Sequence, residues 1–438
     1  MEDILAARLQ MALSLGFHII FACIGMVMPF FMAVSHFLWI RTGNEVYKNL
    51  TKAWSKGVAI FFATGAVSGT MLSFELGLLW PTFMKHAGPI FGMPFSLEGT
   101  AFFIEAIALG FFLYGWNIFN KWFHWFTGVV VGLSGLASGI LVVAANAWMN
   151  SPAGFDFVQG EYLNVDPMAA MFNDAWVSQS IHMTLAAFAA TGFAVAGVHA
   201  AMIYQQKNVR FHMKAFKIAA VFASVASLLQ PLSGDHSAKD VAVRQPGKLA
   251  AMEAHFHTER GASLIVGGIP DSEEQTVSYA VKIPGMLSWL AFGDMDAEVK
   301  GLNDIPPDYH PPVTVVHFAF QIMVGVGGAL ALMSLLFFVG LKRSAWLTQR
   351  WFLLLFALAT PLGFIAVEAG WTVTEVGRQP WIIYGVMKTS DAVTPMPGIA
   401  WSFYLFTAVY ISLSLMVIYL LHRQIKVVPI LYDKTTTT

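Results

Sequence analysis

Nine long apolar stretches constrain this 438-residue chain more than any other feature of its sequence. A helix needs about 20 mostly apolar residues to cross a bilayer. In lipid the backbone must satisfy its own hydrogen bonds, which a helix does within a single segment. We therefore predict an all-α integral membrane protein with about nine transmembrane helices. The predicted spans cover residues of about 10–39, 54–80, 95–119, 123–148, 176–204, 214–231, 312–341, 350–374 and 398–422.

Charged residues make up only 12% of the chain, against about 25% in soluble domains, and most lie between the spans. If the N-terminus is outside, fifteen of the 25 Lys and Arg residues fall in cytoplasmic segments and four in the short outer ones. Because short cytoplasmic loops carry an excess of Lys and Arg, we predict an outer N-terminus and a cytoplasmic C-terminus. The net charge of −1 gives no reason to expect nucleic acid. The single cysteine, Cys23, excludes an intrachain disulfide bond.

The spans divide the chain into four parts. Residues 1–231 carry six spans, 232–311 form an extracytoplasmic loop, 312–425 carry three further spans, and 426–438 form a cytoplasmic tail whose end we expect to be disordered. A loop of this length is usually functional or disordered. Within it, the run PGKLAAME begins at Pro246 with a helix-start proline and continues with strong helix formers. We predict a surface helix there, near the outer face of the membrane.

Polar and metal-ligating residues within the spans gather at one depth. Seven of them, from five different spans, fall in the outer half of the membrane, whereas a random set would scatter. They are His18, Glu98, Glu105, His182, Met323, Glu368 and Glu375. In two spans the glutamates lie seven residues apart, which is about two helical turns, and therefore share a face. Such ladders suit a proton relay; the alternative is that each carboxyl is neutral or paired for structural reasons.

Three of these residues are of types that bind haem iron. Histidine is a common protein ligand of haem, and His with Met gives a low-spin six-coordinate site. His18, His182 and Met323 therefore have suitable chemistry at compatible depths. Each also has an ordinary alternative, because a membrane histidine often bonds to a neighbouring helix and the chain has 22 methionines. His317 lies on the same span as Met323 and is a rival ligand.

The end of the eighth span combines charge with aromatic residues. The run from Trp371 to Trp381 reads WTVTEVGRQPW and holds Glu375 and Arg378. Charge at the edge of a bilayer is normally expelled to loops or retained for a function. We interpret Glu375 as an iron ligand or a proton-handling group, and Arg378 as a charge partner for a haem propionate.

These residues resemble a known family. The run GWTVTEVGRQPW from Gly370 is similar to the GWxxxExGRQPW signature of subunit I of cytochrome bd-type quinol oxidases. Further similar runs occur along the chain in the family's order. They are SLGFH at Ser14, LEG at Leu97, ANAWMNSP at Ala145, IH at Ile181, QPGKLAAME at Gln245 and AVEAGW at Ala366. The resemblance covers nearly the whole chain.

The resemblance implies three haems near the outer face. A low-spin haem b would take His182 and Met323 as iron ligands. A high-spin haem b and a haem d, or a further haem b in its place, would take His18 and Glu375, in an order that the resemblance leaves open. The remaining implied assignments are Trp371 and Arg378 at the cofactors, Arg378 also in catalysis, Glu98 and Glu105 as proton donors or as groups that neutralise haem charge, and Lys248 and Glu253 in quinol oxidation.

The resemblance also implies a function, a location and partners. The chain would be the haem-containing subunit of a terminal oxidase in the cytoplasmic (inner) membrane of a bacterium or archaeon. It would oxidise ubiquinol or menaquinol, with Glu253 as the candidate proton acceptor, and reduce dioxygen to water. Protons drawn from the cytoplasm would generate proton motive force by charge separation without pumping. Expected partners are subunit II, a small single-helix subunit as a further candidate, quinol, dioxygen and the lipid bilayer.

Three other functions remain open from the residues. The first is a dihaem quinol-linked electron carrier without an oxygen-reducing site. The second is an ion or proton transporter that uses the glutamate ladders without haem. The third is a scaffold subunit whose ligands no longer bind a cofactor. An absorption spectrum of the protein, reduced and with carbon monoxide, separates them.

Three features depart from the common family pattern or indicate a branch. Gln321 stands where the family usually has an arginine, two residues before the ligand methionine. Loss of that cation would favour the reduced haem or leave a propionate unpaired. The loop lacks the long insertion of some members. The run LSFELGLLWP, from Leu72 to Pro81, resembles the cyanide-insensitive members, some of which carry little or no haem d.

Overall fold

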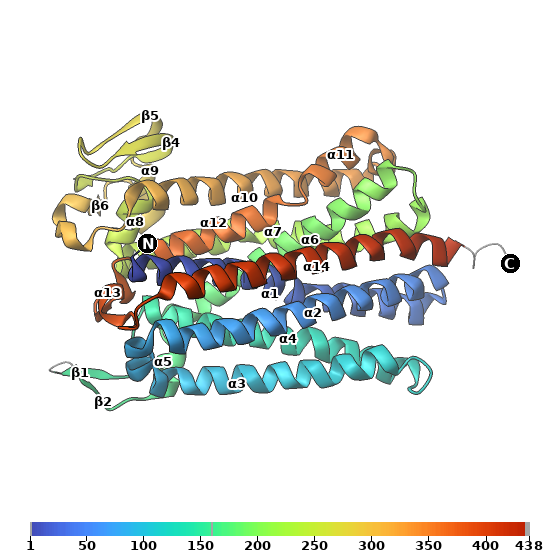
Figure 1. The fold of residues 1–438 in the computed structure, drawn as a ribbon. Helices are drawn as coiled ribbons and strands as arrows, with labels where there is room; N and C mark the ends of the chain where they lie inside the picture. The colour runs from blue at the N-terminus through green and yellow to red at the C-terminus, as the bar shows by residue number, and fades with distance from the viewer. Residues whose placement is uncertain (1, 159–160, 434–438) are drawn as a thin grey trace.

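A computed structural model describes residues 2–158 and 161–433 (Figure 1). Within these residues, nine helical segments are long and apolar enough to cross a membrane, which confirms the predicted all-α membrane fold. They are α1 (Asp3–Thr42), α2 (Glu45–Leu79), α3 (Pro81–Tyr114), α4 (Lys121–Asn150), α6 (Trp176–Tyr204), α7 (Val209–Arg244), α10 (Val313–Lys342), the consecutive pair α11 (Arg350–Leu358) and α12 (Leu362–Val376), and α14 (Ile399–Asp433).

Several spans extend beyond their predicted ends, and α3 and α7 do so by the largest margins. α3 begins at Pro81 rather than near residue 95, because Pro89 and Pro94 lie inside the helix without ending it. Proline is tolerated in membrane helices, where neighbouring helices and local adjustments satisfy the freed backbone groups. α7 continues to Arg244 instead of ending at residue 231. The predicted boundary between membrane helices and outer loop therefore falls inside a helix.

Ion pairs between successive turns explain the extension of α7. Lys239 Nζ lies 2.6 Å from a carboxylate oxygen of Asp235, and Arg244 Nη2 lies 3.5 Å from one of Asp240. Pairs at this spacing stabilise an exposed helix by about 0.2–0.5 kcal/mol each. Because this part of the helix is charged, a search for apolar runs does not detect it.

Short elements connect the spans. The short helices are α5 (Pro167–Met171), α8 (Pro246–Met252), α9 (Met286–Phe292) and α13 (Thr389–Ala392), with single 3-10 turns at Leu302–Asp304, Pro307–Tyr309 and Ser344–Thr348. The strands of the described residues form four antiparallel pairs. They are β1 (Asp156–Val158) with β2 (Glu161–Leu163), β3 (Glu259–Arg260) with β6 (Glu298–Val299), β4 (Leu264–Asp271) with β5 (Thr276–Ile283), and β7 (Trp381–Ile383) with β8 (Met387–Lys388).

The long loop gathers at one end of the bundle. Figure 1 shows α8, α9, β6 and the β4–β5 hairpin at the end where the N-terminus lies, and the C-terminus at the opposite end. An odd number of spans requires this separation. The helix predicted from Pro246 is present as α8, but it is buried against the bundle and is not a surface helix. Residues 426–433 of the predicted tail belong to α14, and the predicted disorder at 434–438 lies outside the described residues.

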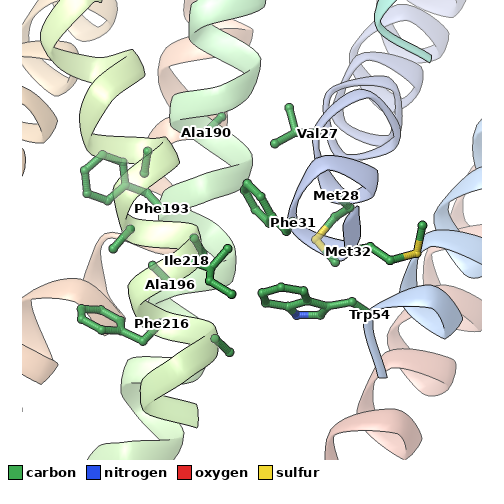
Figure 2. Close-up of a cluster of buried hydrophobic side chains, with 14 of the residues drawn as sticks. Val27, Met28, Phe31, Met32, Trp54, Ala190, Phe193, Ala196, Phe216 and Ile218 are labelled. Carbon is green, nitrogen blue, oxygen red and sulfur yellow. The ribbon is translucent and has the colours of Figure 1, made fainter. Parts of the chain in front are cut away.

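The largest apolar cluster lies in the middle and the inner half of the bundle, and smaller apolar clusters lie at the outer end. Figure 2 shows part of it, where Phe31 of α1, Trp54 of α2 and Phe193 of α6 contribute large side chains. Small residues bring α6 and α7 close together, since a Cβ at Gly192 would lie only 2.7 Å from Cβ of Ala223. The polar residues singled out in the sequence lie nearer the other end of the bundle.

Candidate functional site

Glu375 and Arg378 form the first part of the site, at the end of α12. Arg378 Nη2 donates a hydrogen bond of 2.5 Å to Glu375 Oε2. Asn146 Nδ2, from α4, donates to the other carboxylate oxygen of Glu375. Arg378 is only 2% exposed, and its Nε and Nη1 have no hydrogen-bond partner within the described residues. The glutamate is thus held by two donors, and the guanidinium keeps two buried N–H groups for an anionic partner.

His18 and His182 are each held in one orientation by a serine of the adjacent helix. His18 Nδ1 lies 2.9 Å from Ser68 Oγ of α2, and His182 Nδ1 lies 2.9 Å from Ser233 Oγ of α7. Both serine hydroxyls already donate to backbone carbonyls one turn earlier, at Thr64 and Gln230. The serines must therefore accept from Nδ1–H. At His18 this tautomer leaves the Nε2 lone pair available to a metal. At His182 the Nε2 lone pair accepts a hydrogen bond of 3.1 Å from Gln230 Nε2, so the Gln230 amide must turn away before this histidine can bind iron.

Glycines make room beside two of the candidate ligands. A Cβ at Gly69 of α2 would lie 3.0 Å from Cε1 of His18. A Cβ at Gly370 of α12 would lie 3.0 Å from the Sδ of Met323 on α10. Both distances are shorter than ordinary van der Waals contact, so a larger residue would displace the imidazole or the thioether. Gly370 directly precedes Trp371, which is half-buried.

The two glutamates of α3 share a face, as their spacing predicted, and this face packs against α4. Ser138 Oγ donates to Glu98 Oε1 at 2.9 Å. Glu105 is 6% exposed, and a Cβ at Gly135 would lie 3.3 Å from either of its carboxylate oxygens. Because α3 begins at Pro81, Glu98 lies well inside the helix rather than at its start.

Glu368 of α12 points toward α1. Its Oε2 lies 3.1 Å from the position that a Cβ would take at Gly16, and its Oε1 is buried without a hydrogen-bond partner among the described residues. Of the two glutamates of α12, Glu375 thus contacts α4 and Glu368 approaches α1. The ladder predicted on α12 joins two different neighbouring helices.

The helix α8 docks the long loop onto the end of α4. Lys248 Nζ donates to Asn150 Oδ1 at 2.7 Å, and Gln245 Nε2 donates to the Asn150 carbonyl at 2.9 Å. Asn150 Nδ2 in turn donates to the carbonyl of Asn146 at 3.0 Å. A continuous set of hydrogen bonds therefore leads from Lys248 in the loop, through α4, to Glu375.

Burial changes the acid–base properties of both loop residues. Lys248 is 5% exposed, and desolvation lowers the pKa of its ammonium to about 7, with a further lowering by Arg378 and an opposing effect of Glu375. Glu253 is 3% exposed, and desolvation raises the pKa of its carboxyl to about 8. Its Oε2 has no hydrogen-bond partner within the described residues. Two groups that usually carry charge thus titrate near neutral pH, as groups that exchange protons must.

His317 and Gln321 of α10 attach the loop to the helix that carries Met323. His317 is fully buried, with Nδ1 2.9 Å from the carbonyl oxygen of Met252 and Nε2 3.2 Å from that of Gly267. Gln321 Oε1 accepts from Gly267 N, and its Nε2 donates to the carbonyl of Ile265, both at 3.0 Å. Both ring nitrogens of His317 face backbone carbonyls, which argues against this residue as the rival ligand.

The comparison with known families identifies this arrangement. The family model described as cytochrome bd terminal oxidase subunit I matches residues 6–429. The chain belongs to this family. It is 37% identical to a Bacillus subtilis (strain 168) protein named putative cytochrome bd menaquinol oxidase subunit I, over 100% of this chain and 99% of that one. It is 30% identical to a second protein of that strain, named cytochrome bd ubiquinol oxidase subunit 1, over 97% and 94% of the two chains.

A solved structure agrees with the sequence comparison. The bd oxidase from Geobacillus thermodenitrificans matches with a TM-score of 0.92 and 37% identity, over 97% of this chain and 98% of that chain. The predicted family, terminal-oxidase function and multi-pass location in a bacterial inner membrane are therefore confirmed. The bd family implies haem cofactors, although it does not by itself distinguish haem b from haem d in this chain.

The residues present fit haem better than a bare metal ion. Within residues 2–158 and 161–433, no group of three or more His, Cys, Asp and Glu side chains converges as a bare ion would require. Haem iron takes four ligands from its porphyrin, so one or two protein ligands suffice. The fixed tautomers of His18 and His182 and the two unpaired N–H groups of Arg378 match this need.

Sequence reasoning missed the residues that support the candidates. Ser68 was not singled out in the sequence, and Asn146 and Asn150 lie in a run that carried only the resemblance. The sequence signal that could have revealed these supporting residues was the presence of side-chain amides and hydroxyls inside the spans. Glu75 of α2 was also given no role, although it is fully buried and accepts from Gln10 Nε2 at 3.1 Å.

Proposed function

We propose that this chain is the haem-containing subunit of a quinol:oxygen oxidoreductase and that the outer end of its bundle carries both half-reactions. The hydrogen-bonded connection from Lys248 through Asn150 and Asn146 to Glu375 is the observation that supports this most strongly. It joins Lys248, a buried proton-exchanging group of the loop, to the candidate iron ligand. Separately, Ser68 and Ser233 hold His18 and His182 in fixed orientations, which a protein that only transported ions would not need.

The proposed cofactor ligands follow from the tautomers and the room beside them. His182 and Met323 hold a low-spin haem b, and His18 and Glu375 hold one further haem each, a haem b and either a haem d or another haem b. Haem, when bound, supplies the electron transfer and the oxygen chemistry. Ser68 and Ser233 orient the imidazoles, and Asn146 orients the Glu375 carboxylate. Arg378 Nε and Nη1, which are buried without a partner among the described residues, would pair with a haem propionate, and Trp371 would help to hold the same cofactor.

The loop residues bind quinol and take up its protons. Glu253 has an unpartnered carboxyl oxygen that can accept the proton of a quinol hydroxyl. Lys248, with a pKa of about 7, can donate a hydrogen bond to a quinone oxygen and change its charge as the quinol is oxidised. Both protons leave on the outer side. The similar Bacillus subtilis proteins are named for menaquinol and for ubiquinol, so both quinols are candidates.

Protons for oxygen reduction reach the site from the other side. Glu105 and Glu98 lie in succession along α3, and Ser138 fixes the outer of the two by its hydrogen bond. These carboxyls would deliver cytoplasmic protons across the outer half of the bilayer. Charge separation then arises without pumping, since quinol protons leave outside and oxygen consumes protons from inside.

The proposal includes partner subunits. Subunit II, and a small single-helix subunit as a further candidate, would cover lipid-facing helices such as α3 and α14. Both helices expose large apolar side chains, among them Phe103 at 67% and Trp401 at 79%. The surrounding bilayer covers the apolar faces that no subunit covers.

Oxygen uptake by the purified, assembled oxidase tests the proposal. We expect quinol-dependent oxygen consumption, and a carbon monoxide difference spectrum from a haem with an open coordination position. A dihaem electron carrier would show haem absorption but neither oxygen uptake nor carbon monoxide binding. A colourless preparation would favour a transporter or a scaffold, and either result would overturn the proposal.

A further inference from the structure

A groove of about 590 Å³ opens at the end of the bundle opposite to the candidate site, between α1, α2 and α7. Its walls change character along the membrane normal. Arg210, Lys214 and Lys217 line it in the first turns of α7, near the inner membrane surface. Val221 and Phe222 line it deeper in the membrane. The groove therefore has a cationic mouth and an apolar interior.

The spacing of these residues places the cations together. Arg210, Lys214 and Lys217 lie at positions i, i+4 and i+7 and therefore share one face of α7. Leu38, near the end of α1, completes the apolar wall. From Arg210 to Phe222 the helix rises about 18 Å at about 1.5 Å per residue, which is the length scale of a lipid acyl chain. The groove thus matches a headgroup followed by a chain.

The three cations lack an anionic partner among the side chains that the structure describes. Among the side chains of residues 2–158 and 161–424, no carboxylate forms an ion pair with Arg210, Lys214 or Lys217. Instead, Lys214 Nζ lies 3.9 Å from the ring centroid of Tyr47, a cation–π contact that fixes its position at the mouth. Like charges on successive turns repel one another. An anion at the mouth would relieve this repulsion.

We propose that this groove binds an anionic glycerophospholipid of the cytoplasmic leaflet. Its phosphate contacts Arg210 and Lys214, with Lys217 close by, and one acyl chain lies along Val221 and Phe222. Basic pockets between membrane helices on the cytoplasmic side bind anionic headgroups in this way. The groove lies far from the proposed haem and quinol sites, so this inference is independent of the proposed function.

Lipid binding by the purified, assembled oxidase tests the proposal. Phosphatidylglycerol and phosphatidylcholine with identical acyl chains are titrated in detergent, and bound lipid is counted by native mass spectrometry. We expect preferential binding of phosphatidylglycerol. The variant Arg210→Gln/Lys214→Gln should bind it about tenfold more weakly or worse. The control Lys342→Gln/Arg343→Gln removes the same charges from exposed inner residues of the same chain and should bind as the parent does.

A second variant tests whether the groove binds a whole lipid, with its acyl chain, or only the headgroup. Val221→Trp fills the apolar part of the groove and leaves all three cations in place. It should also lose phosphatidylglycerol, while an unchanged haem spectrum shows that the oxidase is intact. The proposal is wrong if the parent binds both lipids equally, if the control variant loses as much as the groove variant, or if Val221→Trp binds as the parent does.

Discussion

Gln321 of α10 binds the β4–β5 hairpin by accepting a hydrogen bond of 3.0 Å from the backbone N–H of Gly267. Its side-chain amide also donates to the carbonyl of Ile265. This residue stands two positions before Met323, where the family usually has arginine. The glutamine therefore has a structural role of its own, because it attaches the loop proposed to bind quinol to the helix that carries a proposed haem ligand.

Replacing Gln321 should loosen the loop without removing the haem. In Gln321→Leu both hydrogen bonds are lost, and amide hydrogen exchange at residues 264–283 should accelerate about tenfold. The low-spin haem spectrum should stay unchanged. Gln205→Leu, an exposed glutamine at the inner end of α6, serves as the control. Loss of the low-spin signal in Gln321→Leu would instead mean that Gln321 acts on the haem directly.

Asn146 should control the oxygen-reducing centre through Glu375. Loss of a hydrogen bond to a carboxylate, in Asn146→Ala, should lower oxygen-reduction turnover about tenfold. Asn146→Asp keeps the shape of the side chain but places a like charge beside Glu375, so it should be more damaging than Asn146→Ala. Turnover and the carbon monoxide spectrum measure both effects. If Asn146→Asp retained full turnover, Asn146 would serve only packing.

Ser138 should affect proton delivery rather than haem binding. In Ser138→Ala the Glu98 carboxylate loses its donor, and turnover should fall by about threefold to tenfold while haem content stays constant. Ser134→Ala is the matched control, because Ser134 Oγ donates only to backbone carbonyls of its own helix. Equal effects of the two substitutions would exclude the specific role of Ser138.

Quinol oxidation should accelerate as pH rises toward the pKa of Glu253. A carboxyl accepts a proton only when ionised, and burial raises the pKa of Glu253 to about 8. Its ionised fraction, and with it kcat/KM for quinol, should increase about fivefold between about pH 7 and pH 8. Glu253→Gln should be slow and should lose this dependence, while the exposed Glu259→Gln should retain it. A pH profile that survives in Glu253→Gln would assign the titration to another group.

The sequence predicts the spans well because each depends on a local apolar run. It predicts the ends of the spans poorly where a helix continues through residues that an apolar run would not include. Examples are Pro89 and Pro94 inside α3 and the charged extension of α7. The position of each residue within its predicted span also placed His18, His182 and the glutamates of α3 toward one end of the bundle, without any tertiary information.

The partners of these residues required the structure. Nothing local indicates that Ser68 orients His18, that Asn146 holds Glu375, or that Gln321 binds a hairpin more than fifty residues earlier in the chain. These contacts depend on how the helices pack and rotate about their axes. The burial of α8 has the same origin, since its docking onto Asn150 decides the environment of Lys248.

The reduced absorption spectrum of the assembled oxidase carrying Met323→Leu tests the central claim most directly. Met333→Leu, ten residues deeper on the same helix, makes the same chemical change at a buried methionine and serves as a control. We predict that the low-spin haem signal disappears in Met323→Leu and persists in Met333→Leu, with the other haem signals kept in both. An unchanged low-spin signal in Met323→Leu would contradict the proposed ligand set at the outer end of the bundle.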